Sequence, residues 1–311
     1  MLRKVDFPKS GGFALILAAA LGACAPDTPP PAAAVTASTS PVTRTIDIDG
    51  AQIRVREEGP ADAPAIVLLH GFTMSLESWD GWAERLTDDY RVIRYDLLGH
   101  GMTGPDPLTR YAPDERVEVL GRLLDALGIE RATLGGNSFG GLVAWRFAAA
   151  HPERVERLIL VDSGAYSIYG VTENPVPVPD AMRGYLLAAP LAGVQASATQ
   201  IYADPSRLPE GRIEQIQQMM ARPGNGEAFV GHLEEFVLPD PEADLARVAA
   251  PTLILWGEED RVIPLDHARR IEAAIPDARL ITYPGVGHAP QEEIPGQTAA
   301  DVRAFLEGRD Q

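Results

Sequence analysis

The chain has 311 residues, of which 45% are hydrophobic, so it can bury the core of an enzyme-sized globular domain. Its formal net charge is -17 at pH 7, and no basic stripe with interleaved aromatic residues occurs, which argues against nucleic-acid binding. A single cysteine excludes any disulfide within the chain.

The first residues have the pattern of an export signal. Three basic residues precede the apolar stretch FALILAAALGA (13–23). This stretch is too short to cross a bilayer about 30 Å thick as a helix. Cys24 follows directly, and LGAC (21–24) resembles the lipobox of bacterial lipoproteins. We therefore expect residues 1–23 to be a lipoprotein signal peptide and Cys24 to carry lipid. The alternative is an ordinary signal peptide that ends by chance at a cysteine.

Residues 24–42 are rich in Pro, Ala, Ser and Thr and carry one charge. This composition favours an extended, solvated chain, so we expect a tether between the lipid and the folded body. The protein would then be exported and anchored to the cell envelope of a bacterium, on the periplasmic face, with the lipid as its contact to the membrane.

From residue 43 onward, strand-like and helix-like segments alternate. Strands bounded by turn residues are predicted at 43–50, 51–59, 65–71, 91–101, 131–136, 157–164, 251–260 and 278–285. Helical patterns lie between most of them, at 78–88, 113–128, 138–152, 264–275 and 298–308. The alternation predicts an α/β fold with a mostly parallel sheet covered by helices on both faces.

The alternation is interrupted at residues 166–249. This stretch contains Pro-rich VTENPVPVP and then several helical patches, without a buried strand pattern. We expect a helical cap inserted into a discontinuous core domain, which comprises residues 43–165 and 250–311.

The sequence GGNSFGG (135–141) stands at a predicted junction of strand and helix, the context in which a G-x-S-x-G motif is informative. In a nucleophile elbow the serine occupies a strained turn, and side chains at the flanking positions would collide with the neighbouring strand and helix. Ser138 is therefore the candidate nucleophile. Gly136 and Gly140 would form the elbow pair, while Gly135 and Gly141 would allow close packing of strand against helix.

A serine hydroxyl needs a base to remove its proton, and the base needs a carboxylate to orient it. His288 lies in the Gly-rich loop YPGVGHAP, and Asp260 ends LILWGEED. Both follow predicted strands, and the carboxyl ends of parallel strands share one edge of a sheet, so we expect both to meet Ser138. Asp162, in LVDSG, is the rival acid.

The transition state also needs hydrogen-bond donors for a developing oxyanion. The candidates are the main-chain N–H groups of Phe139, directly after the serine, and of Phe72, in the loop HGFT. No Cys/His cluster has the spacing of a metal site, so we expect neither a metal nor a cofactor.

Together these motifs resemble the α/β-hydrolase superfamily. HGF (70–72), YDLLGHG (95–101), GNSFGG (136–141), GEED (257–260) and GVGH (285–288) occur in the family's order. The resemblance implies an α/β-hydrolase fold in which Ser138, Asp260 and His288 form the catalytic triad. It also implies that Phe72 and Phe139 supply the oxyanion hole.

The nucleophile narrows the reaction. Haloalkane dehalogenases and epoxide hydrolases carry aspartate at the position of Ser138, whereas serine points to acyl transfer. We expect hydrolysis of a small-molecule carboxylic ester through an acyl-enzyme. An apolar acyl or aryl pocket could come from the cap residues Tyr185, Leu186, Tyr202, Phe229 and Phe236.

Other readings stay open. GNSFGG and a helical cap are similar to meta-cleavage product hydrolases, which cut carbon–carbon bonds in vinylogous diketones with the same triad. In that group tryptophan usually follows the histidine, and here Ala289 stands there. Arg212 and Arg222 could bind a substrate carboxylate or simply face water. The remaining alternatives are an aminopeptidase of the proline-releasing type and a non-catalytic binding protein on the same fold.

Overall fold

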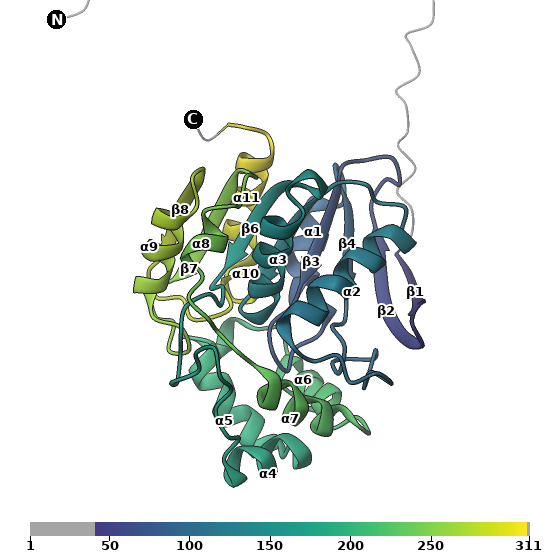
Figure 1. Ribbon diagram of the computed structural model, residues 1–311, viewed down its shortest axis with the longest axis vertical. Coiled ribbons are helices and arrows are strands. Elements are labelled where there is room, and N and C mark those ends of the chain that lie inside the picture. The colour runs from purple at the N-terminus through teal and green to yellow at the C-terminus, as the bar shows by residue number, and fades with distance from the viewer. Residues whose placement is uncertain (1–40, 310–311) are drawn as a thin grey trace, which may run out of the picture. The chain divides into compact units, whose positions relative to one another are not determined.

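The computed structural model describes residues 41–309 (Figure 1). The predicted signal peptide, Cys24 and nearly all of the predicted tether lie outside the described residues. Between residues 41 and 309 there is no helix long and apolar enough to pass through a lipid bilayer.

Eight strands form a single sheet. They are β1 (Val42–Ile48), β2 (Ala51–Glu58), β3 (Ala65–Leu69), β4 (Arg91–Tyr95), β5 (Ala132–Asn137), β6 (Val155–Val161), β7 (Thr252–Gly257) and β8 (Ala278–Tyr283). Their order is β1-β2-β4-β3-β5-β6-β7-β8. The β1–β2 and β2–β4 pairs are antiparallel and all others are parallel, which confirms the predicted α/β class with a mostly parallel sheet.

Helices cover both faces of the sheet (Figure 1). They are α1 (Asp80–Leu86), α2 (Pro113–Ala126), α3 (Phe139–Ala150), α8 (Glu242–Leu245), α9 (Leu265–Ala274), α10 (Pro290–Glu293) and α11 (Pro295–Leu306), with the short 3-10 helices η1 (Leu76–Trp79) and η2 (Pro152–Arg154). A third 3-10 helix, η3 (Pro205–Arg207), belongs to the inserted segment described below. Side chains alternate along β3, so Val67 and Leu69 join the core under α2 and α3, while Ile66 and Leu68 join the core under α1 and α11. Burial on both faces explains why the central strands read as continuous apolar runs.

The segment between β6 and β7 is helical, as predicted, and has no strand among its residues 166–249. It contains α4 (Asp180–Ala188), α5 (Leu191–Ile201), α6 (Arg212–Met220) and α7 (Asn225–Glu235), which lie together at one end of the sheet (Figure 1). We call these four helices the cap. They share an apolar cluster that includes Leu186, Val194 and Phe229, and Met74 from the loop after β3 joins it. The cap is therefore packed onto the loops at that end of the sheet.

Candidate active site

Ser138 occupies a strained turn between β5 and α3. Its φ is 54° and its ψ is -116°, a region that residues other than glycine rarely adopt. A Cβ added to Gly136 would lie 2.3 Å from the Gly140 carbonyl oxygen, and one added to Gly140 would lie 2.3 Å from the Leu69 oxygen. Backbone meets backbone at both positions, so only glycine fits on either side of this serine.

The outer glycines of the motif serve a different purpose. A Cβ on Gly135 would lie 2.6 Å from Leu68 Cδ2, and one on Gly141 would lie 2.4 Å from Ser163 Oγ. Leu68 belongs to the neighbouring strand β3, and Ser163 to the segment that follows β6. Gly135 therefore lets β5 lie close to β3, and Gly141 lets α3 lie close to the segment after β6.

The structure brings His288 and Asp260 into direct contact. His288 Nδ1 is 2.8 Å from Asp260 Oδ2, and both side chains are almost completely buried. The other carboxylate oxygen, Oδ1, accepts hydrogen bonds from the main-chain N–H groups of Val262 and Ile263, at 2.7 and 3.0 Å. With its second oxygen held by two amides, Asp260 presents a fixed acceptor that orients the imidazole.

Asn137, the last residue of β5, joins the serine turn to the histidine loop. Its Nδ2 donates to the main-chain oxygens of His288, at 3.0 Å, and of Val161, at 3.1 Å. A Cβ on Gly71 would lie 2.9 Å from Asn137 Oδ1 and 3.4 Å from Ser138 Cβ, so the loop after β3 also lies against this residue. The Asn137 side chain therefore ties together the loops that carry the candidate catalytic groups.

Asp162, the rival acid, lies behind Asp260. It is fully buried, and its Oδ1 accepts a hydrogen bond from the Gly257 N–H at 3.0 Å. Asp162, Asp260 and His288 each contribute an atom to a cluster whose members lie within 4.8 Å of one another. Burial, and then the negative charge of Asp260, raise the pKa of Asp162 well above its usual range. A raised pKa disfavours the charged form of Asp162, and the carboxylate within hydrogen-bond distance of His288 is that of Asp260.

Two arginines of the sheet hold the segment that follows Phe72. Arg54 donates to Asp96 Oδ2 at 2.7 Å and to both oxygens of Glu77 at 2.9 Å, and Asp96 Oδ1 accepts from the Leu76 N–H at 2.9 Å. The second arginine, Arg94, is buried. This network fixes the start of η1, and through it the loop that carries the candidate oxyanion donor.

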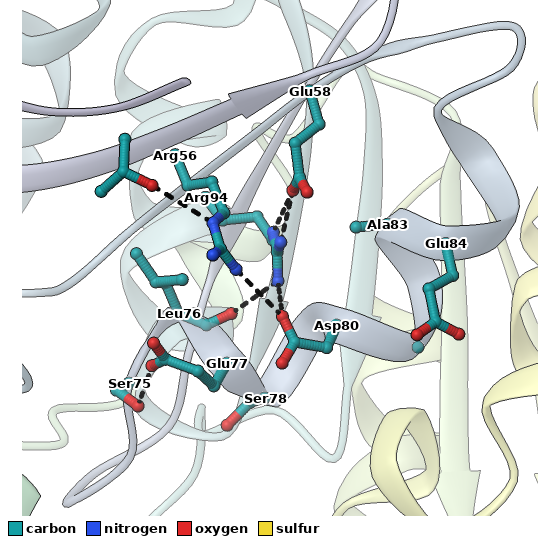
Figure 2. Close-up of polar contacts among 12 residues, drawn as sticks. Arg56, Glu58, Ser75, Leu76, Glu77, Ser78, Asp80, Ala83, Glu84 and Arg94 are labelled. Atoms are coloured by element: carbon teal, nitrogen blue, oxygen red, sulfur yellow. Dashed lines mark hydrogen bonds and ion pairs between the residues drawn. The ribbon is translucent and has the colours of Figure 1, made fainter. Parts of the chain in front are cut away.

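Figure 2 shows the surroundings of Arg94. Its guanidinium donates to Glu58, to Asp80 Oδ1 at 2.5 Å and to the Leu76 carbonyl at 3.2 Å, while Ser75 Oγ donates to Glu77 at 2.6 Å. A buried charge of this kind is stable only when it is fully paired. Glu58 of β2 and Asp80 of α1 provide the pairing on either side.

The cavity beside Ser138 has a volume of about 140 Å³. It is lined by Gly71, Phe72, Thr73, Met74, Asn137, Ser138, Ile201, Val262, His288, Ala289 and Glu292. Ser138 and His288 thus open onto the same small space. Within the described part of the chain, its lining contains no lysine or arginine, and its one carboxylate belongs to Glu292.

Glu292 is already paired. Its Oε2 accepts from Arg212 Nε at 2.7 Å, and its Oε1 accepts from the Tyr202 hydroxyl at 3.2 Å. Arg212 also donates to Ser78 Oγ at 3.0 Å, so this ion pair joins α6 of the cap to the core. Of the two roles left open for Arg212, substrate binding or a solvated position, the structure shows neither, because the side chain is buried and paired with an internal carboxylate.

The predicted cap pocket differs from the observed one. Leu186 and Phe229 lie in the apolar cluster inside the cap, with Tyr185 packed against it, and Phe236 packs on the sheet core. Ile201 is the cap residue that reaches the cavity in the described structure. The amphipathic cap helices bury these side chains inside the cap or against the core. Periodicity predicts that such a helix has an apolar face, but it does not show whether that face packs on protein or lines a substrate pocket.

The buried histidines outside the candidate triad have structural environments. His70 Nε2 accepts from the Leu97 N–H at 3.0 Å, and its Nδ1 lies 2.8 Å from the Gly71 oxygen, which suits one neutral tautomer. Burial lowers the pKa of His70 to about 4 and the pKa values of His100 and His232 well below the usual range. All three are therefore uncharged at neutral pH.

Sequence reasoning missed the two acids that follow Ala289. Besides Glu292, Glu293 accepts hydrogen bonds from the N–H groups of Gly287 at 2.7 Å and Ala203 at 3.0 Å. It thereby fastens the histidine loop to the end of the cap helix α5. No motif marks these residues, since most of their partners, among them Arg212 and Ala203, are distant in the sequence.

A family profile described as "alpha/beta hydrolase fold" matches residues 64–295. A 2-hydroxy-6-oxononadienedioate/2-hydroxy-6-oxononatrienedioate hydrolase of Paraburkholderia phymatum is 32% identical over 258 residues, covering 78% of this chain and 88% of that protein. Among solved structures, a membrane phospholipase A described as a bacterial virulence factor has a TM-score of 0.75 at 27% identity, covering 87% of each chain. A meta-cleavage product hydrolase has a TM-score of 0.74 at 26% identity, covering 85% of this chain and 98% of that one.

The predicted similarity to meta-cleavage product hydrolases is thus confirmed, and it coexists with similarity to a phospholipase. The eight-stranded sheet and the family profile, which matches residues 64–295, both indicate the α/β-hydrolase fold. The protein belongs to the α/β-hydrolase family and is a hydrolase of that fold.

Proposed function

We propose that the protein hydrolyses carboxylic esters through an acyl-enzyme. Ser138 attacks the ester carbonyl while His288 takes the hydroxyl proton, and Asp260 orients the imidazole and stabilises its charged form. His288 then gives the proton to the leaving alcohol, and the acyl group remains on Ser138. Water activated by His288 hydrolyses this intermediate and restores the serine.

The main-chain N–H groups of Phe72 and Phe139 would bind the oxyanion of each tetrahedral intermediate. Phe139 is the first residue of α3, and an N–H group in the first turn of a helix has no partner within the helix. The partial positive charge of the helix terminus adds to its attraction for a negative oxygen. Phe72 lines the cavity from the opposite loop.

The observation that carries the ester assignment is the character of the cavity. It is small, at about 140 Å³, and its lining is apolar apart from the candidate catalytic groups, Thr73, Asn137 and the carboxylate of Glu292. Because Glu292 is already paired with Arg212, the lining offers no free cation to an anionic substrate, whereas a neutral ester with a short acyl chain needs none. We therefore infer a neutral ester as substrate.

Carbon–carbon bond hydrolysis is the second candidate, because relatives at about 30% identity are named for it. The name of the Paraburkholderia phymatum enzyme specifies a dicarboxylate substrate. Binding such a substrate here would need a cation near Ser138, and the nearby Arg212 is engaged by Glu292. This ion pair is our reason for proposing the ester first, while the names of the relatives support the second candidate at least as well.

One comparison separates the two. Purified protein would be assayed with a panel of aryl esters of increasing acyl length and, under the same conditions, with a dienoate diketone. We expect turnover of the short esters, little turnover of the diketone and loss of both in Ser138→Ala. Preferential cleavage of the diketone would establish the second candidate. No turnover of any substrate by the wild type would instead favour a binding protein on this fold.

A further inference from the structure

The imidazole of His232 lies between the side chains of Phe72 and Phe139. It stacks on the Phe72 ring, with centroids 4.8 Å apart and an angle of 22° between the planes. It meets the Phe139 ring edge-to-face, with centroids 4.3 Å apart and an angle of 82°. One cap side chain thus touches both residues whose main-chain N–H groups would form the oxyanion hole.

Phe72 and Phe139 come from separate parts of the chain. Phe72 lies in the loop after β3, and Phe139 opens α3 after the serine turn. Two donors from different segments act together only when the distance between the segments is fixed, and a displacement of about 1 Å at a reacting centre can cost as much as 100-fold in rate. A ring wedged between the two side chains holds that distance.

His232 belongs to α7 of the cap and is 2% exposed. Phe236 stacks on it at 5.4 Å, and His100 meets it edge-on at 6.3 Å. The ring hydrogen-bonds the main chain of Tyr111, while its Nδ1 has no hydrogen-bond partner among the described residues. The imidazole therefore also links α7 to the loop before α2.

The surroundings keep the His232 ring uncharged. The Arg116 guanidinium lies close by, 5.2 Å from the Phe139 ring centroid. Burial, followed by the charge of Arg116, lowers the pKa of His232 well below its usual range. The contact with both phenylalanines is therefore one between neutral aromatic rings.

We propose that His232 is a positioning residue for the oxyanion hole, and that docking of the cap sets the geometry of this hole through the His232 ring. The proposal rests on the proposed function, because it takes Phe72 and Phe139 as the donors. A cap that moves away from the core withdraws the ring and separates the two donors. Substrate contacts with the cap would in this way control the chemical step as well as binding.

Three substitutions at this position test the role of the ring. His232→Phe keeps an aromatic ring, His232→Leu keeps apolar volume without a flat ring, and His232→Ala removes both. We expect kcat for a short aryl ester to fall about 10- to 100-fold in the Ala and Leu variants and less in the Phe variant. KM should change by less than about threefold, because the ester's ground state does not use the oxyanion contacts.

Leu186→Ala is the matched control. Leu186 is fully buried in the cap cluster, so its loss loosens the cap without removing a ring from between the phenylalanines. We expect this variant to lose stability and to keep kcat within about threefold of the wild type. If it loses as much kcat as His232→Leu, general loosening of the cap explains the result and the proposal is wrong.

A transition-state analogue gives the direct readout. An alkyl trifluoromethyl ketone adds to a nucleophilic serine as a hemiketal whose oxygen occupies the oxyanion hole, so its affinity reports the hole itself. We expect its inhibition constant to rise in step with the fall in kcat across the three His232 variants. An unchanged kcat and an unchanged inhibition constant in folded His232→Leu would refute the positioning role. If His232→Ala does not fold, the measurements on His232→Leu are sufficient for this test.

The proposed function has a separate failure. Wild-type protein that does not hydrolyse esters, or a Ser138→Ala variant that still does, would overturn the ester mechanism. An active wild type, an inactive Ser138→Ala and a fully active His232→Leu would overturn the role of His232 alone.

Discussion

Arg212 of α6 and Glu292 of α10 form a buried ion pair at the edge of the Ser138 cavity, with Arg212 Nε 2.7 Å from Glu292 Oε2. Breaking such a pair by removing one partner leaves an uncompensated charge and costs about 3–5 kcal/mol. We therefore expect Glu292→Gln to lower the free energy of unfolding, as measured by urea denaturation. Replacing both residues by Met should recover much of that loss.

The same change should alter substrate choice. In Glu292→Gln the Arg212 charge is no longer neutralised beside the cavity, so an ester with an anionic acyl chain gains a partner. We expect kcat/KM for an aryl hemisuccinate to rise relative to that for the matching butyrate. A ratio that does not move would mean that Glu292 has no part in excluding anions.

Asp260 and Asp162 can be distinguished by substitution. We expect Asp260→Asn to lower kcat about 10⁴-fold, the loss seen when a triad acid no longer fixes the histidine tautomer. Asp162→Asn should stay within about tenfold of the wild type, because Asp260 and not Asp162 contacts His288, and an amide oxygen can keep the Oδ1 contact with Gly257. Steady-state kinetics of the two variants decide which carboxylate is used, and a reversed order would make Asp162 the triad acid.

Acid should destabilise the fold through its buried histidines. An unfolded histidine binds a proton below about pH 6.5, whereas burial lowers the pKa of folded His70 to about 4. Between these values the unfolded state holds more protons, so the free energy of unfolding falls as the pH falls, by up to about 1.4 kcal/mol per pH unit for each such group. The loss begins near pH 6.5 and continues down to the folded pKa.

Thermal unfolding between about pH 7 and pH 4.5 measures this effect. His232→Phe removes one of the titrating groups, so its melting temperature should fall less steeply with acid than that of the wild type. Equal slopes in the two proteins would show that burial of His232 does not govern acid stability.

We propose that the protein is exported and held at the bacterial cell envelope by lipid on Cys24. Expressed from its full sequence, it should fractionate with membranes, and Cys24→Ser should move it to the soluble fraction. Mass spectrometry of the membrane form should show a chain that begins at Cys24 and carries acyl groups. Membrane association that persists in Cys24→Ser would refute the lipid anchor.

The sequence predicted the sheet because each strand carries its own pattern. Buried parallel strands such as β3 and β7 are short apolar runs between turn residues, and the glycines around Ser138 mark a turn that no other residue could form. Asp260 and His288 could be located because the ends of parallel strands share one edge. These inferences need only local pattern and one rule of topology.

The contacts between cap and core could not be predicted in this way. Glu292 and Glu293 lie in an unremarkable acidic stretch, and their partners, among them Arg212, are brought near only by docking of the cap. The position of His232 depends likewise on how α7 meets two loops of the core. Tertiary packing decides which core residues the side chains of an inserted helix contact, and the periodicity of the sequence does not predict that packing.

The backbone at Ser138 has a thermodynamic consequence for the whole chain. A φ of 54° with a ψ of -116° costs a serine about 1–3 kcal/mol, and a glycine much less. Ser138→Gly should therefore melt at a higher temperature than Ser138→Ala, although both are inactive, which differential scanning calorimetry can check. Stability favours a glycine at this position, whereas activity requires the serine. The packing of the surrounding sheet therefore holds the serine in a backbone conformation that is unfavourable for it.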